Sequence, residues 1–343
     1  MAKTIQSSAN NLTKKVWEEK LYRDSVKESF FMERFSGTSS DNIVHVKSNL
    51  EAGKGDKITF GLRMKLSGAG VEEGQILEGN EEALSTYDFS LTLKQYRHAV
   101  RDDGEMDRKR AVWDMDEESR SALKDWMTEK IDQLCFDAAF LNPTLTAYRS
   151  NASTGAFATN ATYATALADI SAANSKCNAA FLSALKTIAK NGQGRNFIPL
   201  RPIKYKGKMY YVLLVHDDVV YDLKQDPILQ AAWENAMERG EDNPLFRDAV
   251  VVWDGVIVHS HENVPKGTNG GGGAVAYSKG VLLGAQGLAW AWGRRPKVVE
   301  KDFDYEDEHA YAIGMLGRAG KPVFNSKDYG SIHCVFARTN ISG

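Results

Sequence analysis

Two histidines near residue 260 have a spacing compatible with metal binding. His259 and His261 stand two positions apart at the end of an apolar run that predicts a strand, and Glu262 follows them. Alternate residues of a strand point to the same face, so both imidazoles are expected on one side. Zinc sites need three or four ligands, but the segment ends at Val264-Pro265 without a third ligand at suitable spacing. We therefore interpret the pair as a polar strand end and expect no metal site.

Four consecutive glycines, Gly270–Gly273, have the composition of a loop that could cradle a phosphate group. A P-loop requires the order Gly-x-x-x-x-Gly-Lys-Ser/Thr between a strand and a helix, and the chain does not contain this order. We interpret the four glycines, together with Asn269, as a flexible loop.

Two clusters of acidic residues could offer oxygen ligands to a hard cation. The first comprises Asp302, Asp304, Glu306, Asp307 and Glu308, and the second comprises Asp102, Asp103, Glu105 and Asp107. The first cluster lacks the glycine and the ligand spacing of an EF-hand, so a solvated acidic face is expected. The second lies beside the basic residues 108–110 and is expected to pair with a neighbouring chain across an interface.

Catalytic signatures are missing from the sequence. Neither a Gly-x-Ser-x-Gly elbow, nor a His-Glu-x-x-His motif, nor a dinucleotide-binding fingerprint occurs. Cys135, Cys177 and Cys334 are far apart and form no Cys-x-x-Cys pair, so reduced thiols are expected. The sequence thus predicts no catalytic residue, no cofactor and no enzymatic activity.

The composition is that of an ordinary globular protein. The 343 residues are 43% hydrophobic and 26% charged, and the length favours two domains. A formal net charge of −2 argues against a dedicated nucleic-acid binder, which needs a clear excess of Lys and Arg. The start of the chain lacks a secretory signal. The most apolar stretch, Val281–Trp292, contains two glycines and is too short to span a membrane, so no membrane association is expected.

Residues 11–35 show the periodicity of an amphipathic helix, with apolar side chains recurring four positions apart. Large aromatic side chains so near a terminus need a cover, which is either the chain's own core or a neighbouring subunit. Both alternatives stay open from the sequence. The candidates for contact with a neighbouring subunit are Trp17, Phe30, Phe31 and Phe35.

Two alternating runs, at 57–64 and 87–97, predict strands that flank a polar, glycine-rich segment at 65–85. This arrangement predicts a long hairpin whose tip has few large apolar residues to bury. Loops of this length usually bind something or are disordered. Its acidic residues are further candidates for inter-subunit contact: Glu72, Glu73, Glu78, Glu81 and Glu82.

A long helix is predicted at 114–141, where Pro143 follows and apolar residues recur in steps of three and four. Its predicted buried stripe comprises Leu123, Met127, Ile131, Leu134, Ala138 and Leu141. The stretch 144–178 is rich in small and polar residues and is interpreted as a linker or surface loop. Helices are then expected at 180–190, 219–224 and 228–237, and strands at 43–48, 209–215, 249–253, 256–260, 309–316 and 331–338. The fold class is therefore α+β.

This order of elements resembles the tailed-phage capsid fold, often called the Hong Kong ninety-seven fold. The stretches 280–293 (GVLLGAQGLAWAWG), 302–306, 312–316 and 321–330, together with 17–24 and 53–60, are similar to the major capsid proteins of N-four-type phages. On this resemblance the chain divides into an N-terminal arm (1–47), an extended-loop hairpin with flanking strands (48–101), the spine helix of a peripheral domain (102–144), an axial domain (145–300) and the closing strands of the peripheral domain (301–343).

The resemblance implies a structural major capsid protein that self-assembles into hexamers and pentamers, forming the icosahedral head around double-stranded DNA. Its implied partners are copies of itself, a portal protein, a decoration protein and, through non-specific contact, the packaged DNA. A separate scaffolding protein is also expected, because the predicted arm helix begins within about ten residues of the initiator. The implied location is the virion, with assembly in the host cytoplasm. The main alternative is an encapsulin-like bacterial nanocompartment shell, and a more distant one is an enzyme with a cation site at His259.

Overall fold

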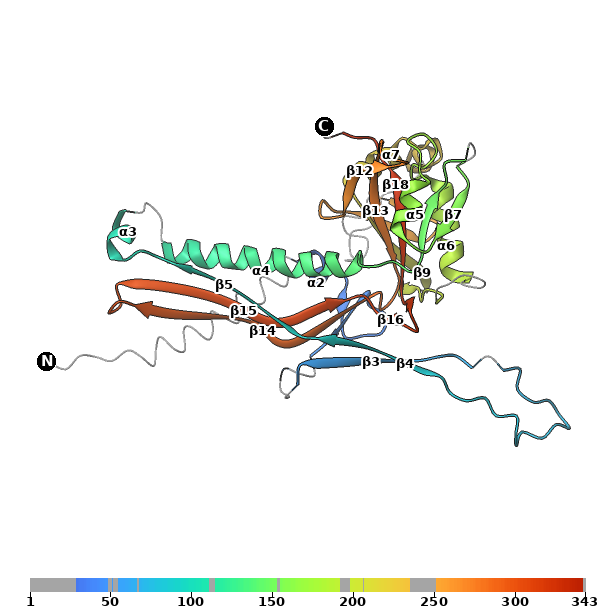
Figure 1. Cartoon of the computed structure of the whole chain (residues 1–343), viewed down its shortest axis with the longest axis horizontal. Coiled ribbons are helices and arrows are strands. Elements are labelled where there is room, and N and C mark those ends of the chain that lie inside the picture. Colours follow the sequence, from blue (N-terminus) through green and yellow to red (C-terminus); the bar gives the residue numbers. More distant parts are fainter. Residues whose placement is uncertain are drawn as a thin grey trace.

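The protein is described by a computed structural model covering residues 29–48, 51, 55–66, 68–110, 115–152, 155–191, 198–205, 207–234 and 251–341. Its elements form a flat, elongated part and a more compact part, and a long hairpin extends from their junction (Figure 1). The helices are α2 (Phe30–Arg34), α3 (Glu105–Arg110), α4 (Met115–Ala139), α5 (Tyr163–Ala168), α6 (Ala179–Asn191), α7 (Asp217–Lys224) and α8 (Pro227–Glu234).

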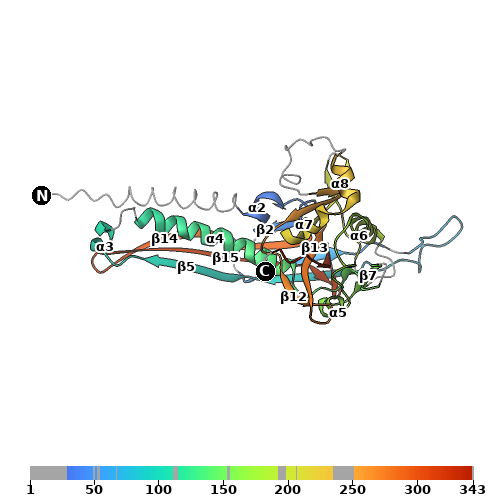
Figure 2. The ribbon, with the colours of Figure 1, turned by 90° about the horizontal axis from the view of Figure 1, so that it is seen from above.

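The elongated part is a five-stranded sheet with α4 lying along one face (Figures 1 and 2). Its order is β1 (Ser36–Gly37), β2 (Val44–Lys47), β14 (Leu288–Phe303), β15 (Glu308–Gly320) and β5 (Lys94–Arg101). Alternation along β14 decides which residues meet the helix, because successive side chains of a strand point to opposite faces. Trp290 and Trp292 share a core cluster with the buried residues of α4, whereas Ala289 and Ala291 belong to a separate cluster on the other face.

The predicted long helix is confirmed, with a small difference at its end. Leu123, Met127 and Ile131 are buried, as the three–four spacing predicts. The helix ends at Ala139, however, and Leu141 is 56% exposed, so its place in the buried stripe was wrong. The stripe ends early because the chain leaves the helix before Leu141 can face the sheet. Asp114, the first residue of the predicted helix, lies outside the described residues.

The compact part is built on a nine-stranded sheet. Its main path is β10 (Val251–Trp253), β11 (Val256–Ser260), β9 (Lys208–Val215), β13 (Val275–Leu283), β18 (Ser331–Ala337), β6 (Thr146–Arg149) and β7 (Phe157–Asn160), while β12 (Lys266–Gly270) pairs with β13 and β8 (Ile203–Tyr205) with β9. Phe181, Leu182 and Leu185 of α6 join the apolar side chains of these strands in one core cluster. The strands expected at 249–253 and 256–260 form a hairpin: Asp254 and Gly255 between them have positive φ, and β10 pairs antiparallel with β11.

The stretch 144–178, interpreted as a linker, contains regular structure. It forms β6, β7 and α5, and β6 adds to β18 in parallel with Ala147 opposite Cys334. Its small side chains are buried against the sheet, where Ala147 and Ala166 are fully covered. The prediction failed because tertiary pairing, rather than local hydrophobicity, makes these strands.

The sheets do not follow the expected domain boundaries. β14, expected to close the axial segment, starts at Leu288 and pairs with β15, whereas β18, expected to close the peripheral domain, lies inside the nine-stranded sheet. The apolar stretch that covers both β13 and β14 changes sheet at residues 284–287, where Gln286 has a positive φ of 59°. The sequence could not show that the chain moves from one sheet to the other here, because β13 and the start of β14 are both apolar.

The predicted long hairpin is confirmed: β3 (Lys57–Arg63) pairs antiparallel with β4 (Thr86–Thr92) and projects away from the body (Figure 1). The predicted strand at 87–97 is two strands, because Leu93 leaves the hairpin register and the chain enters β5 in another sheet. A short hairpin of β16 (Val323–Phe324) and β17 (Lys327–Asp328) completes the fold. Among the described helices, none has the length and apolar character needed to cross a membrane.

Candidate assembly surfaces

The tip of the long hairpin, residues 68–85, is exposed at every position except Val71. Glu72, Glu73, Glu78, Glu81 and Glu82 all face solvent. Two of them brace the tip: the Gly68 amide donates to Glu82 Oε2 over 2.6 Å, and the Gly79 amide to Glu81 Oε2 over 2.8 Å. Two hydrogen bonds between side chains and backbone therefore support a tip that presents carboxylates to solvent.

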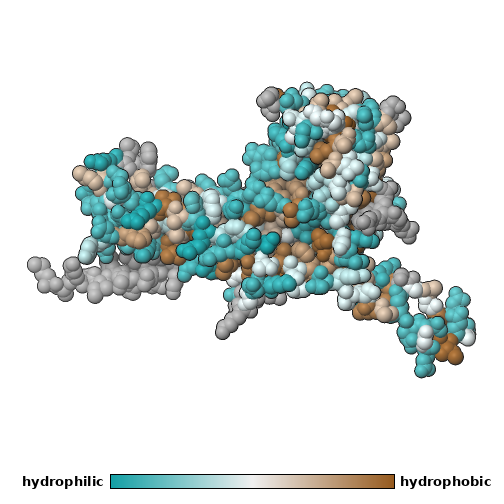
Figure 3. Space-filling view, in the orientation of Figure 1, coloured by the Kyte–Doolittle hydropathy of each residue, from teal (hydrophilic) through white to brown (hydrophobic). Residues whose placement is uncertain are grey.

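The tip also exposes apolar side chains that the sequence prediction underrated. Ile76 and Leu77 are 72% and 61% exposed, and Leu66 and Leu84 are also exposed. Figure 3 shows hydrophobic and hydrophilic side chains mixed over this tip, at the lower right. Large apolar side chains presented to water beside carboxylates are typical of a surface that becomes covered in an assembly.

The face of the five-stranded sheet that points away from α4 is basic. His98 of β5 faces α4, because its ring centroid lies 5.0 Å from that of Trp126. Odd-numbered residues of β5 therefore point to the opposite side. On β14 the buried Val298 faces α4, so its neighbours point to that same open side. Four exposed basic residues lie there in matching register across β15: Arg97, Arg101, Lys297 and Lys301.

These residues, here called the basic face, flank a floor of small side chains. Ala310, Ala312 and Gly314 of β15 lie between the two basic rows. Two strand spacings separate the rows by roughly 10 Å, which leaves a shallow strip wide enough for another chain segment. Arg97 and Lys297 face each other across Gly314, whereas Arg101 is held by Glu308 and by the Phe303 ring.

The near end of this open face is already covered by the hairpin's own base. Ile58, Phe60 and Leu91 form a small core with Ala289 and Ala291. The glycines that interrupt β14 and β15 permit this approach: a Cβ at Gly320 would stand 2.3 Å from Leu91 Cδ2. The base thus anchors the hairpin on the body and leaves the distal basic rows uncovered within the described residues.

The aromatic residues of the arm pack inside their own subunit. Phe31 is fully buried and Phe35 is 3% exposed, and Phe31 meets Phe136 of α4 with ring centroids 4.8 Å apart. Phe30 is half-buried and stacks on the same ring. The subunit's own core thus covers Phe31 and Phe35, which is one of the two covers that the sequence left open, while Phe30 keeps a partly exposed ring. Trp17 lies outside the described residues.

The histidine pair belongs to this same aromatic cluster. His259 is 1% exposed and lies 5.3 Å from the Phe35 ring, while His261 lies 4.6 Å from the Phe136 ring. Burial lowers the pKa of His261, which favours the neutral ring. The two histidines lie at the end of β11, as predicted, but they are buried or partly buried because the arm covers this edge of the sheet. Among the described residues no three His, Cys, Asp or Glu side chains gather as a metal site.

The acidic clusters meet at the far end of the elongated part. Asp102 Oδ2 lies 2.8 Å from Arg108 Nη1, and Glu105 Oε1 lies 2.7 Å from Lys109 Nζ. These charges therefore have partners within the subunit, while the pairing expected across an interface stays a prediction. Between β14 and β15 the turn at 304–306 has three consecutive positive φ angles, and Tyr305 at its centre is fully exposed.

The glycine run is a turn rather than an unstructured loop. Gly271, Gly272 and Gly273 have positive φ angles between β12 and β13, and the Gly271 amide donates to Leu167 O over 2.7 Å. A Cβ at Gly271 would stand 2.4 Å from Ile170 O, so glycine is required by close approach as well as by φ.

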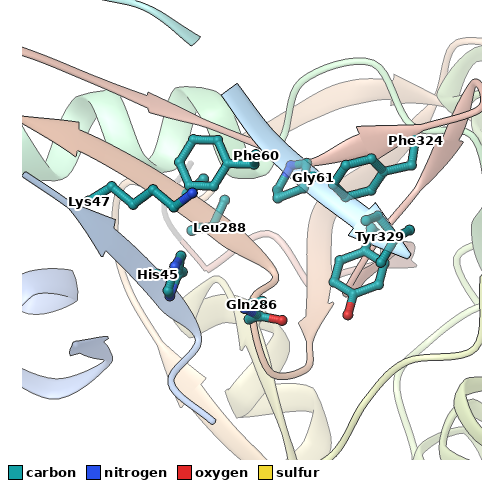
Figure 4. A pocket seen from close by; sticks show the side chains of 11 residues that line it. His45, Lys47, Phe60, Gly61, Gln286, Leu288, Phe324 and Tyr329 are labelled. Atoms are coloured by element: carbon teal, nitrogen blue, oxygen red, sulfur yellow. The ribbon is translucent and has the colours of Figure 1, made fainter. Parts of the chain in front are cut away.

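A small recess lies where the hairpin joins the body (Figure 4). Its volume is about 110 Å³, and its walls include Phe60, Phe324, Tyr329 and His45. Lys47 lies with Nζ 4.4 Å from the centre of the Phe60 ring. The recess is well below the roughly 300 Å³ of ordinary ligand pockets, so it fits a single side chain better than a substrate.

Comparisons with known proteins agree with these features. The chain is 28% identical to the major capsid protein of Pseudomonas phage KPP25, over 95% of this chain and 96% of that protein. Its fold is similar to the capsid of Ralstonia phage GP4, with a TM-score of 0.76, 22% identity and coverage of 92% of this chain and 93% of the other. The cyanophage Pam1 capsid gives a TM-score of 0.74 at 22% identity, covering 91% and 93%.

These structural matches show that the mixed sheet-and-helix architecture is that of tailed-phage capsids, as the resemblance predicted. The model of the family described as "Phage capsid protein" matches residues 5–335, which is nearly the entire chain. This chain therefore belongs to the phage capsid protein family.

Proposed function

We propose that this chain is the major subunit of a tailed-phage head and that it assembles through its long hairpin. The family membership and the full-length similarity to a major capsid protein support this role. A structural rather than a catalytic role agrees with the histidines acting as packing residues. The phage relatives favour this function over the nanocompartment alternative.

The finer details extend this proposal. Hexamers and pentamers would be the building units, with a separate scaffolding protein, a portal protein and a decoration protein as partners. Double-stranded DNA would be enclosed by non-specific contact, which suits a chain whose net charge is −2 rather than strongly positive. Assembly would take place in the host cytoplasm before the subunit becomes part of the virion.

The observation that carries the hairpin contact is the match between two surfaces of one chain. The tip offers five exposed glutamates, while the basic face offers Arg97, Arg101, Lys297 and Lys301. The hairpin points away from the body (Figure 1), so the tip cannot reach its own basic face. Contact between them therefore joins one copy to the next, which is a heterologous contact able to close into a ring.

A charge exchange tests this contact. Arg97→Glu with Lys297→Glu reverses one cross-strand row of the basic face, and Glu72→Lys with Glu73→Lys reverses part of the tip. Each double variant alone should lower particle yield by at least about tenfold, because a shell repeats every weak contact at each subunit. Combining the four changes should restore much of the yield, measured by sedimentation of assembled particles.

A matched control reverses two acids elsewhere. Asp125→Lys with Glu129→Lys changes the same charge on the exposed side of α4 and should leave the yield near that of the unchanged protein. If the combined variant assembles no better than the single reversals, the tip does not meet the basic face. If neither reversal affects assembly, the hairpin is not an assembly contact.

A further inference from the structure

A buried set of polar side chains lies where the chain passes from β15 to β18. Lys321 and Asp328 stand at the two ends of the β16–β17 hairpin, and His333 lies on β18. The side chains of Lys321 and Asp328 are 3% and 0% exposed, and that of His333 is fully covered. None of these residues belongs to the surfaces described above, and their chemistry is unassigned.

The contact between Lys321 and Asp328 is close but is not an aligned hydrogen bond. Lys321 Nζ lies 2.6 Å from Asp328 Oδ1. Asp328 Oδ1 is nevertheless a buried oxygen without a hydrogen-bond partner of acceptable geometry among the described residues. The amine therefore sits directly against the carboxyl group at Oδ1.

The surroundings supply a proton acceptor and an oxygen-binding donor. His333 Nε2 lies 3.2 Å from Lys321 Nζ, and an ammonium group carries donors only, so Nε2 is the accepting nitrogen. Its Nδ1 then donates to Tyr163 Oη over 2.6 Å. On the other side, the backbone amide of Thr144 donates to Asp328 Oδ2 over 2.9 Å.

We propose that Lys321 and Asp328 react within the folded subunit to form an intramolecular amide bond. The juxtaposed amine and carboxyl group, the neighbouring imidazole and the amide hydrogen bond to Oδ2 are the elements that such a condensation needs.

The atoms balance without an added reagent. A proton passes from the Lys321 ammonium to Asp328 Oδ1, which gives a neutral amine and a carboxylic acid. The nitrogen attacks Cγ while Oδ2, held by the Thr144 amide, carries the developing negative charge. His333 takes a second proton from the nitrogen and delivers it to the Oδ1 hydroxyl, which leaves as water. The third proton stays on the new amide nitrogen.

Burial favours this outcome over the charged pair. In water an amine and a carboxylic acid persist as ions, but taking an ion pair out of water carries a large desolvation cost. Desolvation lowers the pKa of Lys321, although the Asp328 carboxylate acts in the opposite direction. Burial, together with the cations Lys321 and Lys279, lowers the pKa of His333 well below its usual value, so the ring is neutral and able to accept a proton.

The bond would link the two ends of residues 321–328, in the segment that connects the two sheets. The connection from β15 in the five-stranded sheet to β18 in the nine-stranded sheet runs through these eight residues, 321–328, and a few that follow. Thr144, which follows α4, hydrogen-bonds Asp328 through its amide and its hydroxyl. The amide would therefore close a covalent loop at the junction of α4, the hairpin and both sheets.

The intact mass of the denatured full chain tests the proposal. After incubation in the folded state, the protein should weigh less than its sequence by one water molecule. Lys321→Arg keeps the positive charge but cannot form this amide, so its mass should equal that of its sequence. Lys327→Gln, at the neighbouring, partly buried lysine, should retain the deficit.

An aspartate that cyclises with its own backbone also loses one water, and Asp103-Gly104 and Asp254-Gly255 are sequences prone to this reaction. A deficit that persists in Lys321→Arg, or that hydroxylamine removes, would place the loss at such a site and overturn the proposal. An unchanged protein whose mass equals that of its sequence would show that Lys321 and Asp328 are only an ion pair, which also overturns it. Neither result affects the proposed shell function.

Discussion

At the scale of single residues, one carboxylate of α4 fixes the root of the arm. Asp132 is buried and accepts hydrogen bonds from the Ser29 hydroxyl over 2.5 Å, from the Phe30 amide over 2.9 Å and from the Phe31 amide over 3.3 Å. It thereby satisfies the free amides at the start of α2. The periodicity of α4 could not identify this role, because Asp132 lies beside the apolar stripe and its partners are distant in sequence.

Asp132→Ala is expected to destabilise the subunit by about 1–3 kcal/mol, because it leaves the buried donors of the arm without an acceptor. Asp125→Ala, an exposed acid on the same helix, should change stability by no more than about 0.5 kcal/mol. The measurement is the thermal midpoint of each unassembled variant. Equal midpoints for the two variants would mean that Asp132 does not hold the arm.

His333 gives the subunit a pH dependence of defined sign. Burial, reinforced by Lys321 and Lys279, lowers its pKa in the folded state, whereas the unfolded chain titrates near its ordinary pKa of about 6.5. The unfolded state therefore binds more protons below that pH. Stability is fully present above about pH 6.5 and falls below it, by up to about 1.4 kcal/mol per pH unit. His216 and His261 shift in the same direction.

Replacing His333 with glutamine should remove one titrating group from this response. Denaturant unfolding at about pH 7.5 and pH 5.5, a window spanning the ordinary histidine pKa, should show a smaller loss of stability for His333→Gln than for the unchanged protein. Identical losses would show that His333 is protonated in the folded state as easily as in the unfolded chain.

At the scale of elements, local periodicity predicted some segments and could not predict others. Helix α4 and the hairpin β3–β4 followed from spacing, since each buries one face over many residues. Strands β6 and β7 did not, because their small and polar residues become strands only by pairing with β18. The basic face was missed for a related reason: Arg97 and Lys297 are neighbours only once β5, β15 and β14 are aligned.

Deleting residues 68–82 and joining the strands with a short turn tests whether the tip is needed for folding of the subunit or for assembly. The thermal midpoint of the isolated subunit should change little, because the tip is exposed and each doubling of loop length costs only about 0.6 kcal/mol. Shell formation should fail, since the glutamates and the exposed Ile76 and Leu77 are lost. Raising salt should likewise weaken assembly of the intact protein, because exposed charges are screened.

The two readouts are the melting midpoint and the particle yield in sedimentation. A deletion that melts early, while its surviving fraction builds normal shells, would mean that the tip supports the subunit rather than the assembly. A deletion variant that melts normally and still assembles would show that the hairpin tip is not required for assembly.

At the scale of the whole molecule, two sheets share one chain through repeated crossings. The chain leaves the nine-stranded sheet after β13, forms β14 and β15, and returns as β18, so neither part is a continuous segment. The sequence predicted the class of fold through the order of its elements, but it could not assign strands to sheets. The resulting shape is elongated, and the hairpin projects away from the sheet that carries the basic face (Figure 1).

Electron microscopy of the full chain, expressed with a candidate scaffolding protein from the same genome, tests the central claim most directly. Closed shells built from rings of subunits are the predicted result, with each hairpin tip lying over the basic face of a neighbouring copy. A protein that stays monomeric at high concentration, with and without the scaffolding protein, would contradict the assignment as a head-shell subunit.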